Sequence, residues 1–269
     1  MFIADTHIHL NDSQYASDWR ELIAQAAEQG VRAFIVPGTD LPTSRRALEM
    51  AQLSSAILPA IGIHPHEADS FQEGDIERLR QLAPQALALG EIGLDFHYNF
   101  SPPGRQLEVL EAQLELAHSL NLPLILHLRE ADGEAYPLLK RWGLPPAGGV
   151  VHCFSSDWEA ARRYLDLGFY LGFTGMITFP KLEELRQVAR RSPLDRLLIE
   201  TDGPYLAPVP YRGRRCLPQW IRYTLTQLAS VRQRAEEEIL EITSQNAIRL
   251  FGPRLSHLLT EDSPAPLGS

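Results

Sequence analysis

The sequence predicts an α/β protein, a (β/α)8 TIM barrel with C-terminal helices. Three observations predict this fold. Short apolar runs alternate with longer segments of helical period, the number of apolar runs is eight, and polar residues fall at the ends of these runs. A doubly wound open sheet is the competing architecture, and the count of eight favours the barrel.

The expected strands are short and bounded by glycine, proline or polar residues, as buried parallel strands usually are. They span residues 2–5, 33–37, 57–63, 86–91, 123–127, 149–152, 169–174 and 197–202. In a barrel the carboxyl ends of all strands meet at one mouth, so residues that are far apart in the sequence converge there.

The segments between the strands have helical periodicity. Helices are expected over residues 19–29, 105–119, 157–166 and 181–191, and again over 219–231 and 236–250 after a loop rich in proline and arginine at 204–218. Leu107, Leu110 and Leu114 recur at three-to-four spacing, which indicates a helix with one apolar face. Gly30 and Gly168 stand where helices should end.

Composition limits the class of protein. The 269 residues are 44% hydrophobic and 22% charged, which suits one hydrolase domain over residues 1–260 with a flexible tail at 261–269. The formal net charge of −9 argues against a broad grip on duplex nucleic acid. Two cysteines without a Cys-x-x-Cys motif, no signal peptide and no membrane-spanning run together predict a cytoplasmic protein without a membrane partner, and we expect a monomer.

His7 and His9 follow the first expected strand at a spacing of two. That spacing places both side chains on the same side of an extended segment, which is a chelating arrangement for one metal ion. The competing interpretation is a pair of histidines that cap a core strand by hydrogen bonds. For Asp-Thr-His-Ile-His-Leu after an apolar strand we favour metal binding.

Four further candidate ligands follow later strands. Glu91 comes just beyond an apolar run, where a carboxylate is costly to desolvate unless it is paired or ligates a cation. His127 and His152 could each be a hydrogen-bonded core histidine, but together with Glu91 they make a second ion site plausible. Asp202 ends the eighth expected strand and lies beside the first strand once the barrel closes, so it can reach the ion at His7 and His9.

The donor types restrict the metal only loosely. Imidazole and carboxylate ligands suit Zn, Mn, Fe or Co, and Mg if waters complete the shell. We expect two divalent cations, with Mg, Mn and Zn as the candidates. Some barrels of this type bridge their ions with a carboxylated lysine, but Lys140 and Lys181 are the only lysines and both fall in expected helices, so Glu91 is the better bridge.

At these residues the chain resembles the TatD-type metal-dependent deoxyribonucleases of the amidohydrolase superfamily, over roughly residues 2–252. The matching motifs are Asp5-Thr6-His7-Ile8-His9-Leu10, Gly62-Ile63-His64-Pro65-His66, Gly90-Glu91-Ile92-Gly93-Leu94-Asp95, His127 with Arg129-Glu130, Val151-His152-Cys153-Phe154-Ser155 and Thr201-Asp202-Gly203-Pro204-Tyr205-Leu206. The resemblance implies that two metals, sharing Glu91, are held by His7, His9, Glu91, His127, His152 and Asp202. It also implies that His64 contacts phosphate.

The chain departs from the family pattern in one loop. Where the family usually continues Arg-Gly-Lys-Arg-Asn-Glu-Pro, this chain has Arg-Gly-Arg-Arg-Cys-Leu-Pro at 212–218, so Cys216 and Leu217 replace Asn and Glu. The loop borders the barrel mouth, and the change therefore bears on substrate choice and on how the loop is anchored. Ser156 in place of a usual glycine is a minor change.

These residues and the resemblance predict a DNase that acts as a 3′-5′ exonuclease on the ends of single-stranded DNA. Two cations about 3.5–4 Å apart would bridge a water and lower its pKa towards about 7. Asp202 would accept the proton, and His64 would stabilise phosphate charge together with the metals. Arg129, Arg212 and Arg214 are expected substrate contacts unless they are merely solvated, and Tyr205 and Phe96 could stack on a terminal base unless they pack in the core.

Two other functions stay open at this point. Bridging hydroxide also attacks carbonyl carbon, so the same ligands could serve a lactonase, a cyclic-amide hydrolase or a deacylase of aminoacyl-tRNA. His64 and the arginines of the 204–218 loop favour phosphate instead. The second alternative is a non-catalytic metal-binding protein, against which a complete ligand set and a candidate base both argue.

Overall fold

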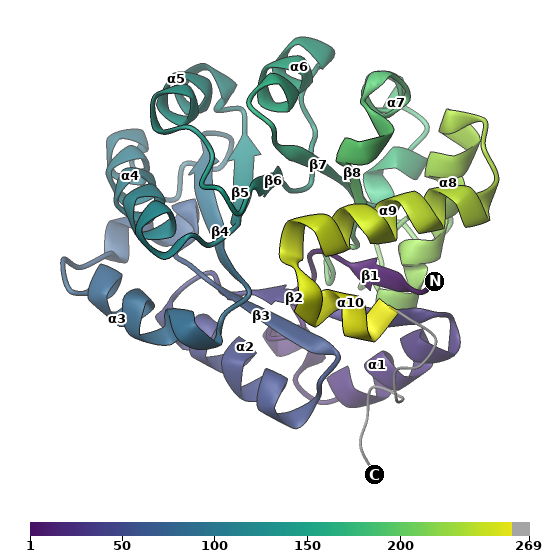
Figure 1. The fold of residues 1–269 in the computed structure, drawn as a ribbon, viewed down its shortest axis with the longest axis horizontal. Coiled ribbons are helices and arrows are strands. Elements are labelled where there is room, and N and C mark those ends of the chain that lie inside the picture. The colour runs from purple at the N-terminus through teal and green to yellow at the C-terminus, as the bar shows by residue number, and fades with distance from the viewer. Residues whose placement is uncertain (260–269) are drawn as a thin grey trace.

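Eight parallel strands form the centre of the molecule in a computed structural model that describes residues 1–259 (Figure 1). The strands lie side by side in chain order and are β1 (Ile3–Asp5), β2 (Val31–Pro37), β3 (Ile57–Ile61), β4 (Ala88–Asp95), β5 (Leu124–Arg129), β6 (Gly149–Val151), β7 (Tyr170–Phe173) and β8 (Leu197–Ile199). This order confirms the predicted (β/α)8 barrel and excludes the open sheet. The expected tail at 261–269 lies outside the described residues.

Helices surround the strands, as Figure 1 shows. They are α1 (Trp19–Glu28), α2 (Leu41–Leu53), α3 (Asp75–Leu82), α4 (Pro103–Leu120), α5 (Asp132–Trp142), α6 (Trp158–Asp166), α7 (Glu183–Arg191), α8 (Ile221–Arg232), α9 (Glu236–Phe251) and α10 (Pro253–Leu259). Polar caps fix where α2 and α6 begin: the Asp40 side chain accepts a hydrogen bond from the Thr43 amide, and the Asp157 side chain accepts one from the Ala160 amide. None of the helices within residues 1–259 has the length and apolar character to cross a membrane.

The barrel closes where β8 meets β1, through hydrogen bonds at and just beyond the strand ends. The Thr6 amide donates to the Ile199 carbonyl at 3.3 Å, and the Asp202 amide donates to the His7 carbonyl at 2.9 Å. The buried Asp5 carboxyl adds a contact of 2.6 Å with the Thr201 hydroxyl. This closure brings Asp202 beside His7, as the sequence predicts.

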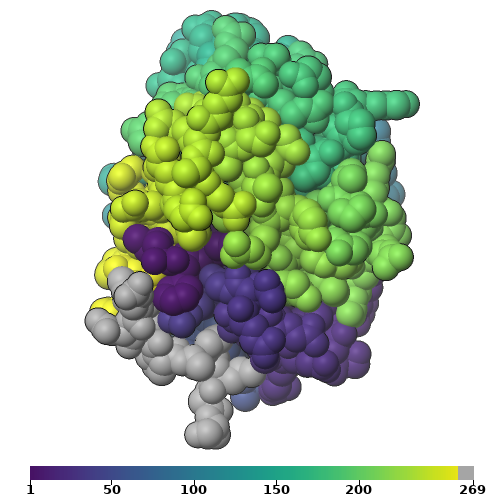
Figure 2. All heavy atoms as spheres, turned by 90° about the vertical axis from the view of Figure 1, so that its right-hand side faces the viewer, coloured from purple at the N-terminus to yellow at the C-terminus, as the bar shows by residue number. Residues whose placement is uncertain are grey.

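Helices α9 and α10 close the opposite, amino-terminal end of the barrel. Leu250, Phe251 and Leu255 join a buried cluster with strand residues such as Ile35 and Val150. The Ser244 hydroxyl donates to the Phe2 carbonyl, and Figure 2 shows the first residues of the chain directly beside these helices. With this end sealed, the carboxyl ends of the strands are left for a site.

Several predicted boundaries are wrong. Strand β8 ends at Ile199, so Asp202 lies three residues beyond the strand and does not end it. Strand β4 continues past Glu91 to Asp95, and β5 continues past His127 to Arg129, so both side chains lie within strands. Gly93 allows this continuation, because a Cβ at that position would lie 1.9 Å from the His127 carbonyl oxygen. Helix α7 begins at Glu183, so Lys181 precedes it.

Candidate metal centre

A cavity of about 1370 Å³ opens at the carboxyl ends of the strands. Its lining includes five of the six predicted ligands, His9, Glu91, His127, His152 and Asp202, and also His64. The sixth, His7, is fully buried and lies behind this lining. In a barrel of this type the active site lies at this end. The predicted ligands therefore converge at the usual position of the active site.

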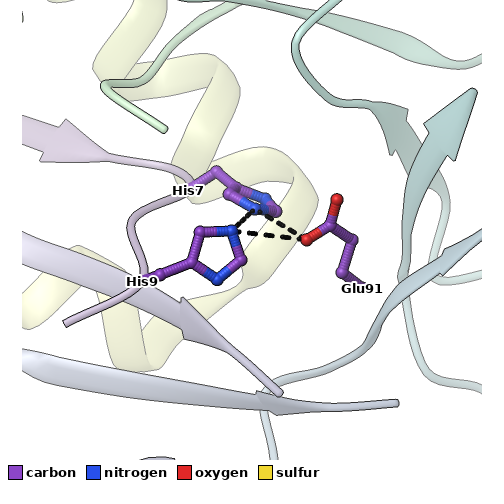
Figure 3. Close-up of side chains that lie close together, drawn as sticks. All are labelled: His7, His9 and Glu91. Carbon is purple, nitrogen blue, oxygen red and sulfur yellow. Dashed lines mark hydrogen bonds and ion pairs between the residues drawn. The ribbon is translucent and has the colours of Figure 1, made fainter. Parts of the chain in front are cut away.

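The carboxylate of Glu91 is the centre of the cluster. Its Oε2 lies 3.2 Å from His7 Nε2 and 3.5 Å from His9 Nε2, and Figure 3 shows both imidazoles turned toward it. Its Oε1 lies 2.6 Å from His152 Nε2, 2.9 Å from His127 Nδ1 and 3.5 Å from His64 Nε2. Each oxygen therefore faces a different group of nitrogen donors.

The first group comes from the closure of the barrel. His7 Nε2 and His9 Nε2 are 3.2 Å apart, and Asp202 Oδ1 lies 3.5 Å from His9 Nε2 and 3.8 Å from His7 Nε2. A backbone hydrogen bond of 2.7 Å from the His9 amide to the Gly203 carbonyl holds the two segments together. The spacing of two residues therefore places both imidazoles on the same side of the segment, as the sequence predicts, and both Nε2 atoms face Glu91 Oε2.

The second group comes from β5 and the residue after β6. His127 Nδ1 lies 3.3 Å from His152 Nε2, and both face the same oxygen of Glu91. The His152 ring is stacked on the His7 ring, with centroids 3.8 Å apart and planes 12° apart. The two groups of donors are thus in direct contact.

The donor set fits divalent cations. Ligand atoms about 2.0–2.2 Å from a Zn-sized ion lie about 3–3.5 Å from one another. Most of the spacings above lie in or near this range, and the 2.6 Å between His152 Nε2 and Glu91 Oε1 is a hydrogen-bond distance. Within residues 1–259, three combinations bring one donor atom per residue within 4.8 Å: His7, His9 and Glu91; His7, His152 and Asp202; and His64, Glu91 and His127. Such a density of buried imidazoles and carboxylates is costly without a cation.

Two further acids support the ligands, and sequence reasoning did not assign them a role. The buried Asp95 places Oδ2 3.1 Å from His127 Nε2, on the side of the ring opposite Glu91. The buried Glu200 lies 3.5 Å from His152 Nδ1 and accepts a hydrogen bond from the Cys153 amide. A carboxylate placed like Asp95 fixes the orientation and tautomer of a ligating histidine. Glu200 places negative charge beside His152, whose buried Nδ1 forms no hydrogen bond within the described residues. Both acids follow apolar residues near strand ends, which is the signal that could have found them.

Electrostatics within the cluster favour charged carboxylates. Burial raises the pKa of Glu91, but the facing His152, His7 and His64 outweigh it and hold that pKa well below its ordinary value. Burial lowers the pKa of His152, but Glu91 and Glu200 outweigh this effect and raise it well above the ordinary value. Burial dominates at His64 and lowers its pKa to about 4.

The predicted substrate contacts divide into two groups. Arg129, Tyr205 and Arg212 line the cavity, and the Arg212 guanidinium lies 4.5 Å from the centroid of the Phe179 ring. Arg214 is exposed and is not among the described residues that line the cavity, because it lies two residues farther along an exposed turn. Phe96 packs partly buried against the core.

The 204–218 loop is anchored largely through its backbone. The Cys216 amide donates to the Pro204 carbonyl at 2.9 Å, and the Tyr15 hydroxyl donates to the Cys216 carbonyl. Arg215 forms an ion pair of 2.6 Å with Asp18. The main-chain atoms of Cys216 therefore anchor the loop, and its side chain is buried.

The barrel and its donor cluster define a class: a metal-dependent hydrolase on an amidohydrolase-like fold. The sequence model of the family described as "TatD related DNase" matches residues 4–252, and the chain belongs to that family.

Individual relatives agree with this assignment. The chain is 41% identical to "Uncharacterized metal-dependent hydrolase YabD" of Bacillus subtilis (strain 168), over 92% of this chain and 98% of the relative. It is 37% identical to "3'-5' ssDNA/RNA exonuclease TatD" of Klebsiella pneumoniae (strain 342), over 92% and 97% of the two chains. The crystal structure of YJJV, a TatD homolog from Escherichia coli K12, superposes with a TM-score of 0.88 at 32% identity, over 93% and 97% of the two chains.

Proposed function

We propose that the chain is a divalent-metal-dependent phosphodiesterase that removes nucleotides from the 3′ ends of single-stranded DNA. The position of Glu91 carries the proposal, because its two oxygens face two separate groups of donors in an open cavity. Two cations sharing this carboxylate would be held by His7, His9 and Asp202 on one side and by His127 and His152 on the other. The similarity to the Klebsiella relative, which is named as an exonuclease of single-stranded DNA and RNA, supports a nucleic-acid substrate.

The bound cations would supply a water activated at neutral pH and would neutralise charge on the phosphate. Asp202 is the proposed base. Burial raises its pKa, but contacts with His9 and the other histidines outweigh burial and lower it, so the carboxylate is unprotonated. Its side chain is 13% exposed, which leaves it in reach of the cavity. The same group can pass the proton on to the leaving oxygen.

His64 is proposed to donate a hydrogen bond to a phosphate oxygen. Its Nδ1 accepts a hydrogen bond from the His66 amide at 3.1 Å, so the neutral ring carries its proton on Nε2. That nitrogen faces the metal centre, 3.5 Å from Glu91 Oε1. Arg129 and Arg212, which line the cavity, would attract the phosphate backbone, and Tyr205 would contact a base.

Digestion of end-labelled DNA tests the proposal. Metal-titrated protein is given single-stranded DNA labelled at the 3′ or the 5′ end, beside a lactone, a cyclic amide and an aminoacyl-tRNA, with Glu91→Ala as the inactive control. We expect metal-dependent release of the 3′ label as mononucleotide. Hydrolysis of a carbonyl substrate alone would show a different hydrolase, and a metal-loaded protein inert on every substrate would show a binding protein.

A further inference from the structure

Two exposed aromatic residues, Tyr98 and Phe100, line the cavity beside the candidate metal centre. They are 50% and 67% exposed and come from the segment between β4 and α4. Large apolar side chains that gather at a cavity while remaining open to solvent mark a binding surface. The mechanism outlined above does not use either residue.

The two rings form a parallel stack, named here the platform. They are stacked with centroids 5.4 Å apart and planes 3° apart. The Arg129 guanidinium lies 4.7 Å from the centroid of the Tyr98 ring, and the His66 ring stands at 82° to Phe100 with centroids 4.7 Å apart. The exposed Phe100 ring at the end of this stack, with the Arg129 cation nearby, matches the alternation of base and phosphate along a nucleic-acid strand.

Buried polar groups anchor both ends of the segment that carries the platform. Asp95 Oδ1 accepts hydrogen bonds from the His97 and Tyr98 amides at 3.0 and 2.9 Å. At the other end of the segment the fully buried Ser101 hydroxyl donates to the His66 carbonyl at 2.8 Å. A surface fixed in this way loses little conformational entropy when a ligand binds.

The same carboxylate connects the platform to the metal centre. Asp95 Oδ2 lies 2.9 Å from His66 Nε2 and 3.1 Å from His127 Nε2. The His66 ring is in contact with His64, with centroids 4.3 Å apart, as well as with Phe100. Two successive ring contacts therefore separate Phe100 from His64, which faces Glu91.

We propose that Tyr98 and Phe100 are a stacking subsite for a nucleobase of one of the two nucleotides that flank the scissile phosphate. This inference rests on the proposed function. It also explains why the proposed nuclease would prefer single-stranded DNA. An unpaired base offers a free face to the platform, whereas a base within a duplex is already stacked and paired. Stacking tolerates any base, so we expect little sequence preference.

Two changes are combined to test the subsite: aromatic rings are removed from the protein, and bases are removed from the DNA substrate. The variants are Tyr98→Leu with Phe100→Leu, which keep apolar bulk without aromatic rings, and Tyr98→Phe, which keeps the ring. Tyr223→Ala is the matched control, because Tyr223 is a partly exposed tyrosine outside the cavity lining. Metal-loaded proteins cleave single-stranded oligonucleotides in which successive 3′ nucleotides are made abasic, and binding of the same oligonucleotides is followed by fluorescence anisotropy in chelator.

We expect the leucine pair to lower kcat/KM about 5- to 150-fold on intact DNA. Wild type should lose a similar factor when one particular base is removed, and on that abasic substrate the leucine pair should match wild type. Tyr98→Phe and Tyr223→Ala should behave as wild type. Equal activity of the leucine pair on all substrates would overturn the subsite while leaving the nuclease function intact.

The remaining outcomes separate the two proposals. If wild type cleaves no nucleic acid but binds it in a base- and ring-dependent way, the subsite stands and the proposed function fails. If it neither cleaves nor binds, both fail. If wild type is a dimer in sedimentation and the leucine pair is a monomer, the rings form a contact between copies of the chain, and the subsite is overturned.

Discussion

Replacing Asp95 with asparagine should show how much metal binding depends on the orientation of the candidate ligand His127, because His127 itself stays in place. The Asp95 side chain is fully buried, and its two oxygens face four donors: His66 Nε2 and His127 Nε2 on one oxygen, and the His97 and Tyr98 amides on the other. Asparagine has nearly the same shape but only one accepting oxygen. One pair of donors must therefore meet an NH2 group.

The expected size of the effect depends on which pair of hydrogen bonds is lost, the pair from the histidines or the pair from the backbone amides. The backbone amides cannot change their protonation, so the asparagine oxygen stays with them and the NH2 group faces the histidines. His127 can then avoid the clash only by moving its proton to Nδ1, which is the atom that faces Glu91 and His152. Loss of such a supporting partner typically costs about 10- to 100-fold in metal affinity or activity. The lost charge-assisted hydrogen bonds should also lower the free energy of unfolding by about 1–3 kcal/mol.

Isothermal titration of the metal-free protein with Zn or Mn measures the affinity, and thermal unfolding measures stability. Asp75→Asn is the control, because Asp75 is also buried and ion-paired, with Arg78, but lies on α3 outside the cavity lining. The control should lose stability without losing metal affinity. Unchanged metal affinity and unchanged turnover in Asp95→Asn would refute the proposed role of this carboxylate.

Three further predictions concern the ligands. Asp202→Asn should lower kcat on single-stranded DNA about 10²- to 10⁴-fold with metal still bound, and full activity with both ions present would remove Asp202 from the base role. Glu91→Gln should reduce the bound metal, measured by inductively coupled plasma mass spectrometry, from two ions per chain to one or none; two retained ions would show that this carboxylate is not shared. Burial lowers the pKa of His127 and His152, but neighbouring carboxylates outweigh it and raise both, so metal must displace protons from these rings. Metal affinity should therefore rise as the pH increases above about 6.5, the ordinary pKa of histidine, and calorimetry in buffers of different ionisation enthalpy should detect proton release. A pH-independent affinity without proton release would contradict this.

The barrel could be predicted because its signal is repeated along the whole chain. Eight apolar runs separated by helical segments leave few alternatives, and the strand ends then place distant residues at one mouth. The extension of β4 was missed because Gly93 reads as an interruption in the sequence. In the folded chain this glycine is required, since it lets β5 approach closely.

The convergence of the six candidate ligands was predictable because each follows an apolar run. The supporting residues were not, because their role depends on what lies beside them in space. Asp95 stands in a motif that the sequence analysis quoted, but only the structure reveals that it contacts both His127 and His66. The difference between Arg212 and Arg214 likewise depends on a turn whose direction the sequence does not specify.

Anomalous diffraction from a crystal soaked in Mn or Zn tests most directly the idea that one carboxylate joins two cations. We expect two peaks about 3.5–4 Å apart, one beside Glu91 Oε2 with His7 and His9, and one beside Oε1 with His127 and His152. A single peak, or ions bound away from Glu91, would contradict the account.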